Sequence, residues 1–273
     1  MSGGLQDMPG MKRHHDGQPK ETDSRTSPFM PMFEVFRNEL DEHHDRRERI
    51  IKASRDITAA SKKIIFSLQR VRSLGSSIPP KISAETQDRA AVIQQHFNTI
   101  APDLAGINGW RYQRQVSPGI QEYTEALSFE HYLRHQKLIT VEEAAATVPS
   151  NITLTADDYI LGIFDLVGEL MRFAITTMAT SGSLPGSEST DVSTEKRDIL
   201  MDLRSLRMCF HGLDTTSCKD TSLGRDSEKK MEVMNTCVEK VEAAVYGMIV
   251  RGRERPKGWV PDLSDDRGTV GSY

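Results

Sequence analysis

Cysteine is scarce in this chain of 273 residues, which contains only Cys209, Cys218 and Cys237. Their number is odd, and none of them lies in a Cys-x-x-Cys or Cys/His spacing typical of metal sites. A disulfide framework and a structural zinc site are therefore not expected. Reduced thiols inside the cell fit the pattern best.

Long hydrophobic runs are also missing. The longest apolar stretch, 159–178, is interrupted by Asp165, Glu169 and Arg172, so we do not expect a membrane-spanning helix. Residues 1–31 lack an apolar core segment, so we expect no secretory signal peptide. The sequence predicts a protein of the cytoplasm and nucleus that works away from membranes.

An excess of positive charge is absent as well. The chain has 35 Lys and Arg residues against 39 Asp and Glu residues, a formal net charge of −4. Wholesale electrostatic attraction to nucleic acid is therefore not expected, and RNA binding would need a local basic patch or a partner subunit. With 37% hydrophobic and 27% charged residues, the composition is that of an ordinary globular protein.

Neither strand-like alternation nor a sequence repeat is present, and apolar residues instead recur at steps of three and four, as in amphipathic helices. This spacing predicts an all-α bundle of six or seven helices in a single domain, 29–253. The tails 1–28 and 254–273 are rich in Gly, Pro and polar residues and are expected to be disordered. We expect helices over 29–71, from about 83 to 104, and over 118–136, 142–148, 155–180, 199–213 and 231–248.

Two helix starts rest on capping signals. Ser117 followed by Pro118 predicts the start of the helix 118–136; the alternative is a longer helix from Ile107 with a kink at Pro118. Thr155-Ala-Asp-Asp158 is typical of a capping box and opens the helix 155–180.

Two of these helices carry carboxylates where a core helix normally carries apolar residues. On the first, Glu122 and Glu125 share a face with the apolar residues Phe129, Tyr132 and Leu133. A solvated acidic face would instead be surrounded by polar side chains, and those lie elsewhere on this helix. The two glutamates are therefore candidates for a buried site.

The second acidic helix carries Asp165, Glu169 and Arg172 in one stripe, at positions i, i+4 and i+7. Gly162 and Gly168 flank this stripe and leave room for an ion or for the close approach of another helix. The other sides of the helix are almost wholly apolar.

Burying a carboxylate without a counter-charge costs several kcal/mol. Four such groups on two neighbouring apolar helices predict one or two divalent cations between the helices. All-oxygen ligands favour Mg²⁺, or Mn²⁺, over zinc. Carboxylate-bound Mg²⁺ supports the hydrolysis of phosphodiesters, so a nuclease is the function that this site would serve.

Ion pairing is the alternative for the same residues. Glu169 with Arg172 fits an intrahelical pair, and Asp158 fits a first-turn cap. Glu122 and Glu125 could pair with basic residues of the first helix, such as Arg46, Arg47 or Arg55, whereas Asp165 has no local partner. A di-iron site would need Glu-x-x-His on two helices, and Asp41-x-x-His44 is the nearest approach to it.

Two segments have compositions that suit RNA, although a solvated helix face explains the second better and helix packing explains the first equally well. The interleaved Trp110, Arg111, Tyr112 and Arg114 would suit stacking on unpaired bases. The first long helix has a basic side that could contact phosphates, made of Arg46, Arg47, Arg49, Lys52, Arg55, Lys62 and Lys63.

At these residues the chain resembles the translin family, and within it the branch of translin-associated factor X, the paralogue and partner of translin. Translin itself looks similar around Gly168-Glu-Leu but lacks the glutamate pair and the aspartate. The matching stretches, in order along the chain, are 36–49, 54–58, 121–129, 158–172, 240–246 and 250–252.

The resemblance implies a seven-helix translin fold and assembly with translin into a hetero-octamer. It further implies a Mg²⁺-dependent endoribonuclease that cuts single-stranded RNA, with single-stranded DNA as a further ligand. Passenger-strand removal in RNA silencing and processing of transfer-RNA precursors are the implied roles. Glu122, Glu125 and Asp165 correspond to the catalytic metal ligands of the family, and Glu169 to a supporting acid.

The chain departs from the family pattern in three places. The basic tail motif is reduced to Lys12-Arg13, the connection 140–155 is short, and the segment 214–226 matches poorly. The alternative function is a non-catalytic adaptor that stabilises translin and helps to hold nucleic acid.

Overall fold

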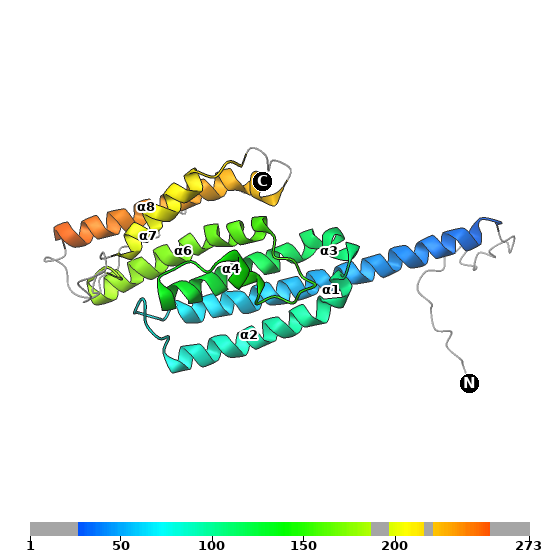
Figure 1. Cartoon of the computed structure of the whole chain (residues 1–273), viewed down its shortest axis with the longest axis horizontal. Coiled ribbons are helices and arrows are strands. Elements are labelled where there is room, and N and C mark those ends of the chain that lie inside the picture. Colours follow the sequence, from blue (N-terminus) through cyan, green and yellow to red (C-terminus); the bar gives the residue numbers. More distant parts are fainter. Residues whose placement is uncertain (1–26, 187–196, 216–220, 252–273) are drawn as a thin grey trace, which may run out of the picture. The chain divides into compact units, whose positions relative to one another are not determined.

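The computed structural model describes residues 27–186, 197–215 and 221–251. In these ranges the chain forms eight α-helices and one short 3₁₀ helix, with no strand (Figure 1). The all-α prediction is confirmed. Most of the two predicted tails, and part of the connection between the helices predicted at 155–180 and 199–213, lie outside the described residues, and the domain boundaries stay a prediction.

The helices follow the predicted periodicity, with one more helix than the six or seven expected because a short helix, α3, precedes α4. Their bounds are α1 Met30–Leu68, α2 Pro80–Ile100, η1 Pro102–Leu104, α3 Ile107–Arg111, α4 Gln113–His135, α5 Val141–Ala145, α6 Ala156–Ser181, α7 Ile199–His211 and α8 Ser222–Arg251. The last helix is longer at its start than the segment 231–248 that the apolar spacing predicted.

The chain divides into two compact units, Met1–Asp45 and Arg46–Tyr273. The described part of the first unit is the beginning of α1, where the exposed rings of Phe33 and Phe36 meet edge to face with centroids 6.2 Å apart. The second unit holds the helical bundle and all four acids singled out in the sequence, and the remaining description concerns this unit alone.

Helix α6 supplies the centre of the core, packed between α4 and α8, while α7 lies against α8 (Figure 1). Leu166, Leu170 and Phe173 of α6 are completely buried, and the Phe173 ring meets that of Phe129 from α4 at 6.3 Å. Hydrophobic burial of this kind is the main stabilising contribution to a bundle.

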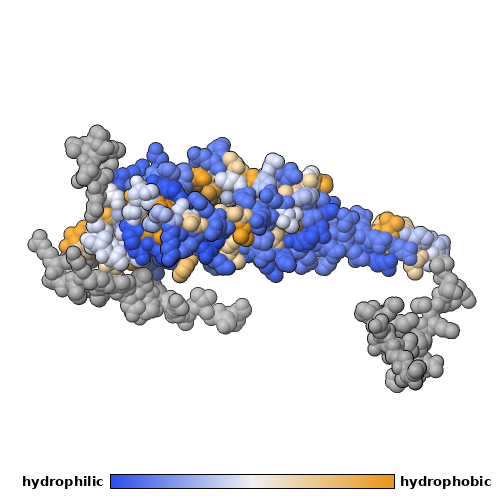
Figure 2. All heavy atoms as spheres, turned by 90° about the horizontal axis from the view of Figure 1, so that it is seen from below, coloured by the Kyte–Doolittle hydropathy of each residue, from blue (hydrophilic) through white to orange (hydrophobic). Residues whose placement is uncertain are grey.

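The surface of the described residues is mainly polar. No helix within the described ranges is long and apolar enough to cross a membrane. The face drawn in Figure 2 is mostly hydrophilic, with separate hydrophobic patches. Cys209 and Cys237 carry free thiols, and Cys218 falls outside the described residues.

The predicted helix start at Pro118 is wrong. Helix α4 begins at Gln113, so Pro118 lies inside it, and the longer alternative from Ile107 is nearer to the structure. The break falls at Tyr112, which leaves the helical conformation between α3 and α4. Ser117 does not cap α4, because it lies inside the helix, and its hydroxyl donates a hydrogen bond to a carboxylate of α6.

That carboxylate belongs to Asp158, which is buried at the start of α6. Thr155 caps α6 by accepting from the Asp158 N–H at 3.1 Å, as the capping signal predicted, and its hydroxyl donates back to the Asp158 carboxylate at 2.7 Å. The amides of Gln113 and Gln121 on α4 each donate to the same carboxylate at 2.9 Å. Asp158 is therefore a cap that also ties α4 to α6.

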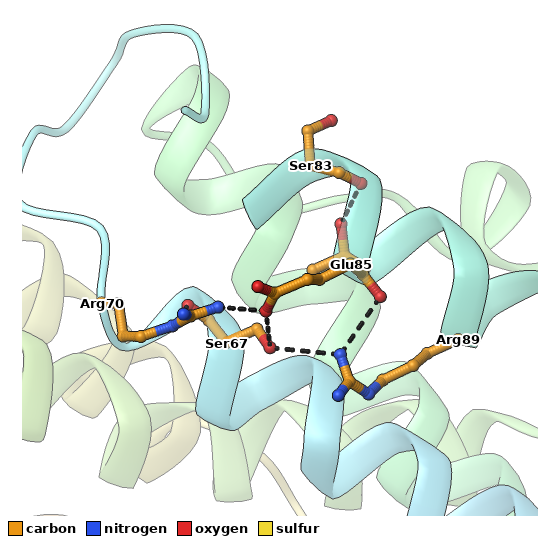
Figure 3. Close-up of polar contacts among 6 residues, drawn as sticks. Ser67, Arg70, Ser83, Glu85 and Arg89 are labelled. Carbon is orange, nitrogen blue, oxygen red and sulfur yellow. Dashed lines mark hydrogen bonds and ion pairs between the residues drawn. The ribbon is translucent and has the colours of Figure 1, made fainter. Parts of the chain in front are cut away.

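A second set of polar side-chain contacts joins α1 to α2 (Figure 3). The Ser67 hydroxyl donates to the Glu85 carboxylate at 3.1 Å, and the Arg70 guanidinium binds the same carboxylate. Arg89 reaches from α2 to the Ser67 hydroxyl at 3.4 Å. These contacts hold the end of α1, which contributes to the acidic site described below.

Glycine determines how closely α4 and α6 approach. A Cβ atom at Gly162 would lie 3.0 Å from the Gln121 carbonyl oxygen and 3.0 Å from the Thr124 Cβ, both on α4. At Gly168, on the same helix, a Cβ would meet nothing within 4 Å. Of the two roles proposed for these glycines, close helix approach applies to Gly162, and Gly168 faces open space.

We expect Gly162→Ala to lower the free energy of unfolding by about 1–3 kcal/mol, because the added methyl group has to push α4 away. Gly168→Ala is the matched control and should be neutral or stabilising by up to about 1 kcal/mol, since alanine favours the helix. Denaturant unfolding of both variants checks this, and equal effects would contradict the close approach.

Candidate active site

The four predicted acids come from the two helices that pack together at the centre of the bundle. Glu122 and Glu125 lie on α4, and Asp165 and Glu169 lie on α6. The two helices run side by side in the bundle (Figure 1). They share one electrostatic environment, since Glu122, Asp165 and Glu169 each raise the pKa of Glu125. The structure therefore brings together the residues that the sequence singled out.

Burial differs among the four acids more than the sequence suggested. Glu125 is only 7% exposed and Glu169 is also buried, as expected for a face shared with apolar residues. The Asp165 side chain, however, is 44% exposed. The expectation of four buried carboxylates is wrong for Asp165, because this residue lies at the open edge of α6 beside α8.

Lysines from two other helices accompany the acids. The Lys230 ammonium of α8 lies 2.5 Å from Asp165 Oδ1, and the Lys62 ammonium of α1 lies 3.7 Å from Glu122 Oε2. An open hollow adjoins the first of these pairs, lined by Phe164, Asp165, Asp226, Lys229, Lys230 and Val233. The counter-charges thus come from residues far away in the sequence.

The sequence had suggested Arg46, Arg47 or Arg55 as partners of the glutamates, and the ion pairs in the described residues do not bear this out. Arg46 bonds to Asp103 at 3.4 Å, and Arg47 pairs with its neighbour Glu48 at 3.0 Å. Lys62 was noted only as part of the basic side of α1, and Lys230 was missed, because no local pattern links α8 to α6.

Glu169 is held by two neighbours. Arg172 Nη1 lies 3.3 Å from one carboxylate oxygen, which confirms the intrahelical ion pair. Gln69, immediately after α1, donates from its amide to Glu169 Oε2 at 2.7 Å and to the Glu169 carbonyl at 3.0 Å. Gln69 thereby fixes the position of Glu169 from the end of α1.

Glu125 is the exception among the four. Within the described ranges no basic side chain forms an ion pair with it. Burial, and then the charges of Glu122, Asp165 and Glu169, raise the pKa of Glu125 to about 9, so its carboxyl is protonated at neutral pH. Burial also raises the pKa of Glu122, although Lys62 opposes the shift.

The site can therefore balance its charge without a metal, contrary to the expectation that four acids would require one. Two lysines, one arginine and a proton compensate the carboxylates. Among the described residues, no three or more His, Cys, Asp or Glu side chains are arranged to hold a metal ion. The donor set itself still fits a hard divalent cation, because all donors are oxygens and Glu125 is buried without a basic partner.

The predicted RNA contacts are only partly exposed. Tyr112 is buried in the core, so base stacking on its ring is wrong, whereas Trp110 is 85% exposed. On α1, Arg49 bonds to Asp103, while Lys52, Arg55 and Lys63 lie on the surface.

A match to the translin family covers residues 45–252 and includes both acidic helices. The chain belongs to the translin family. It is 32% identical over 282 residues to translin-associated protein X of Rattus norvegicus, an alignment that covers 92% of this chain and 91% of the relative. The homologue of that protein in Schizosaccharomyces pombe is 28% identical and covers 82% of this chain and 89% of its own.

Translin and two solved structures are more distant. Translin of Gallus gallus is 22% identical over 228 residues, covering 81% of this chain and 92% of the relative. The crystal structures of apo-NeC3PO and AfC3PO superpose with TM-scores of 0.59 and 0.50, at 17% and 20% identity. Each alignment covers 80% of this chain and 97% of the chain in the solved structure, and these likenesses show the shared all-helical fold.

The protonated state of Glu125 predicts a pH dependence. Its pKa rises from 4.5 in a free side chain to about 9 in the folded chain, so unfolding between these pH values releases a proton. The free energy of unfolding should therefore fall as pH rises through this window, by at most about 1.4 kcal/mol per pH unit. Glu125→Gln removes the titrating group and should flatten the profile.

Thermal unfolding of both proteins from pH 6 to 9 measures the difference between the two slopes. Glu130→Gln is the matched control on α4, since Glu130 pairs with Arg134 outside the acidic site. Parallel profiles for the natural chain and the Glu125 variant would contradict the raised pKa.

Proposed function

We propose that this chain is the catalytic subunit of a Mg²⁺-dependent endoribonuclease that cuts single-stranded RNA in a hetero-oligomer with translin. The observation that carries the proposal is the position of Glu125, a buried carboxyl without a basic partner among three other acids. A group that is costly to ionise in such a place is typical of functional sites. Membership of the translin family supports the same assignment.

Glu122, Glu125 and Asp165 would hold the ion, Mg²⁺ or Mn²⁺, and Glu169 would assist directly or through water. When bound, the ion supplies a water of lowered pKa and stabilises charge on the phosphodiester. The chain has to prepare for this by giving up the Glu125 proton and by freeing Asp165 from Lys230. Gln69 and Arg172 keep Glu169 oriented throughout.

The two lysines that pair with the acids would be displaced by a bound cation, and they have a role of their own in this proposal. Lys62 and Lys230 lie beside the acids, and an incoming RNA strand brings phosphates that need counter-charges. A cation held by the acids would leave both ammonium groups available to those phosphates. Metal binding would favour RNA binding, because it frees two ammonium groups for the phosphates. RNA binding would favour metal binding in turn, because its phosphates would hold these ammonium groups away from the acids.

Translin as partner, single-stranded DNA as a further ligand, and a place in the cytoplasm and nucleus are part of the same proposal. They rest on the likeness to relatives named translin-associated protein X. Passenger-strand removal and processing of transfer-RNA precursors are the processes in which we place the activity.

A second candidate, a non-catalytic adaptor that stabilises translin, is favoured by one specific observation. Three of the four acids already have basic partners, and the described residues hold no ready-made metal site. Under this alternative the acids would stay paired in the assembled complex, and added Mg²⁺ would act only as a salt.

Asp165→Asn tests the catalytic assignment in the complex purified with translin. We expect cleavage of a single-stranded RNA in Mg²⁺ to fall at least about 100-fold, because a carboxylate ligand is lost. Assembly, measured by size-exclusion chromatography, should be unchanged. Asp157→Asn, the same substitution in the first turn of α6, should cleave normally; full cleavage by the Asp165 variant would reject the assignment.

Mg²⁺ should also stabilise the complex against heat. A site that is saturated at 100 times its Kd adds about 2.7 kcal/mol, and Glu125→Gln should abolish the gain. Matching the ionic strength with NaCl separates this effect from screening, which weakens ion pairs slightly. Equal melting temperatures in Mg²⁺ and NaCl would favour the adaptor, and iron in the purified protein would instead point to a di-iron site.

A further inference from the structure

Phe66 is an exposed aromatic residue in a part of α1 that is otherwise polar on its outer side. Its side chain is 76% exposed, although its chain neighbours Ile65 and Ser67 are buried in the bundle. Single apolar residues on a surface are common and need no explanation by themselves. Phe66 differs from such residues because it lies next to the acidic site.

The residues one turn before and one turn after Phe66 both contact the acidic site. Lys62, at i−4, lies 3.7 Å from Glu122 Oε2, and Gln69, at i+3, donates to Glu169 Oε2 at 2.7 Å. Gln69 follows the last residue of α1 but continues its last turn, because its N–H donates to the Ile65 carbonyl at 2.9 Å. Residues at these spacings share one face of a helix. The exposed ring is therefore placed between two contacts to the candidate catalytic acids.

The same side of α1 is basic. The exposed Lys52, Arg55 and Lys62 recur at steps of three and seven, with Lys63 beside them, and Phe66 continues the stripe by one further turn. This pattern combines cations for a phosphate backbone with one ring at the end nearest the acids. It is the combination that single-stranded nucleic-acid sites use, in which basic side chains follow the backbone and aromatic rings stack on bases.

We propose that Phe66 stacks on an unpaired RNA base next to the phosphate that is cut, and so positions the strand over the acidic site. The inference rests on the proposed function and deepens it by naming a residue that binds the base. An unpaired base suits the ring because every base has a flat π-face, so the contact selects single strands without selecting a sequence. A paired base, stacked inside a duplex, could not make the contact.

A binding experiment without catalysis tests the proposal. The complex with translin is titrated with a short fluorescent single-stranded RNA in EDTA. Stacking on one base contributes about 1–3 kcal/mol, which corresponds to roughly a 5- to 150-fold change in Kd. We expect Phe66→Ala and Phe66→Leu to weaken binding within this range, and Phe66→Trp to keep it.

Phe66→Leu separates the aromatic ring from apolar bulk, because leucine keeps a large apolar side chain but has no π-face. If Phe66→Leu binds as tightly as the natural chain, the contact is not aromatic stacking and the proposal fails. Size-exclusion chromatography separates the other use of an exposed ring, a subunit contact, because Phe66→Ala would then impair assembly. Folding should tolerate every variant, since the side chain is mostly in solvent.

An abasic RNA series identifies the base. Removing the stacked base should weaken RNA binding by the natural chain. On that abasic RNA, the natural chain and the Phe66→Ala variant should then have the same Kd. A Phe66 effect that persists at every abasic position would overturn the proposal. Cleavage that is independent of Phe66 would overturn this inference and leave the nuclease intact, whereas base-dependent binding without cleavage in Mg²⁺ would reject the nuclease alone.

Discussion

The contact between α4 and α6 is the constraint on which the candidate site depends. The absence of a side chain at Gly162 lets the Gln121 carbonyl and the Thr124 side chain approach α6. At this spacing the carboxyl groups of two helices enter one electrostatic environment. A larger residue at position 162 would push the helices apart and weaken the coupling between the acids, so core packing and the chemistry of the site are linked.

Close approach creates a charge problem that the chain solves in three different ways. Exposed Asp165 and half-buried Glu122 form ion pairs with lysines. Glu169 pairs with an arginine and accepts a hydrogen bond from a glutamine, and buried Glu125 keeps its proton. Each solution suits the local burial, because an ion pair is tolerable near water whereas protonation is the cheaper choice in the core. A divalent cation would compete with all three, which couples its binding to proton release and to lysine movement.

The aromatic ring at Phe66 fits the same arrangement. Lys62 in α1 and Gln69 immediately after it contact the acids, and both are positioned by a helix whose other side is buried. The polar contacts of Ser67, Arg70 and Glu85 fix this end of α1 to α2. A residue between Lys62 and Gln69 is thus on a rigid element beside the site, where a substrate contact is most precise.

Sequence reasoning predicted most of the helices and the acids on α4 and α6, because apolar periodicity is a local property and a carboxylate on an apolar face breaks it visibly. It failed at Pro118, where hydrogen bonds from Ser117, Gln113 and Gln121 to buried Asp158 stabilise a helix through the proline. Capping rules consider only neighbours in the chain and cannot include a carboxylate about forty residues away.

The amino-acid sequence by itself determined the helical class and the acidic pattern that suggested a metal, since both are properties of residue types at fixed spacing. Only the tertiary structure decided which acids are buried and which cations reach them. Lys62 and Lys230 become partners of Glu122 and Asp165 because α1 and α8 pack beside α4 and α6. Protonation of Glu125 follows from the same packing, because a pKa depends on the charges and the water around a group in space.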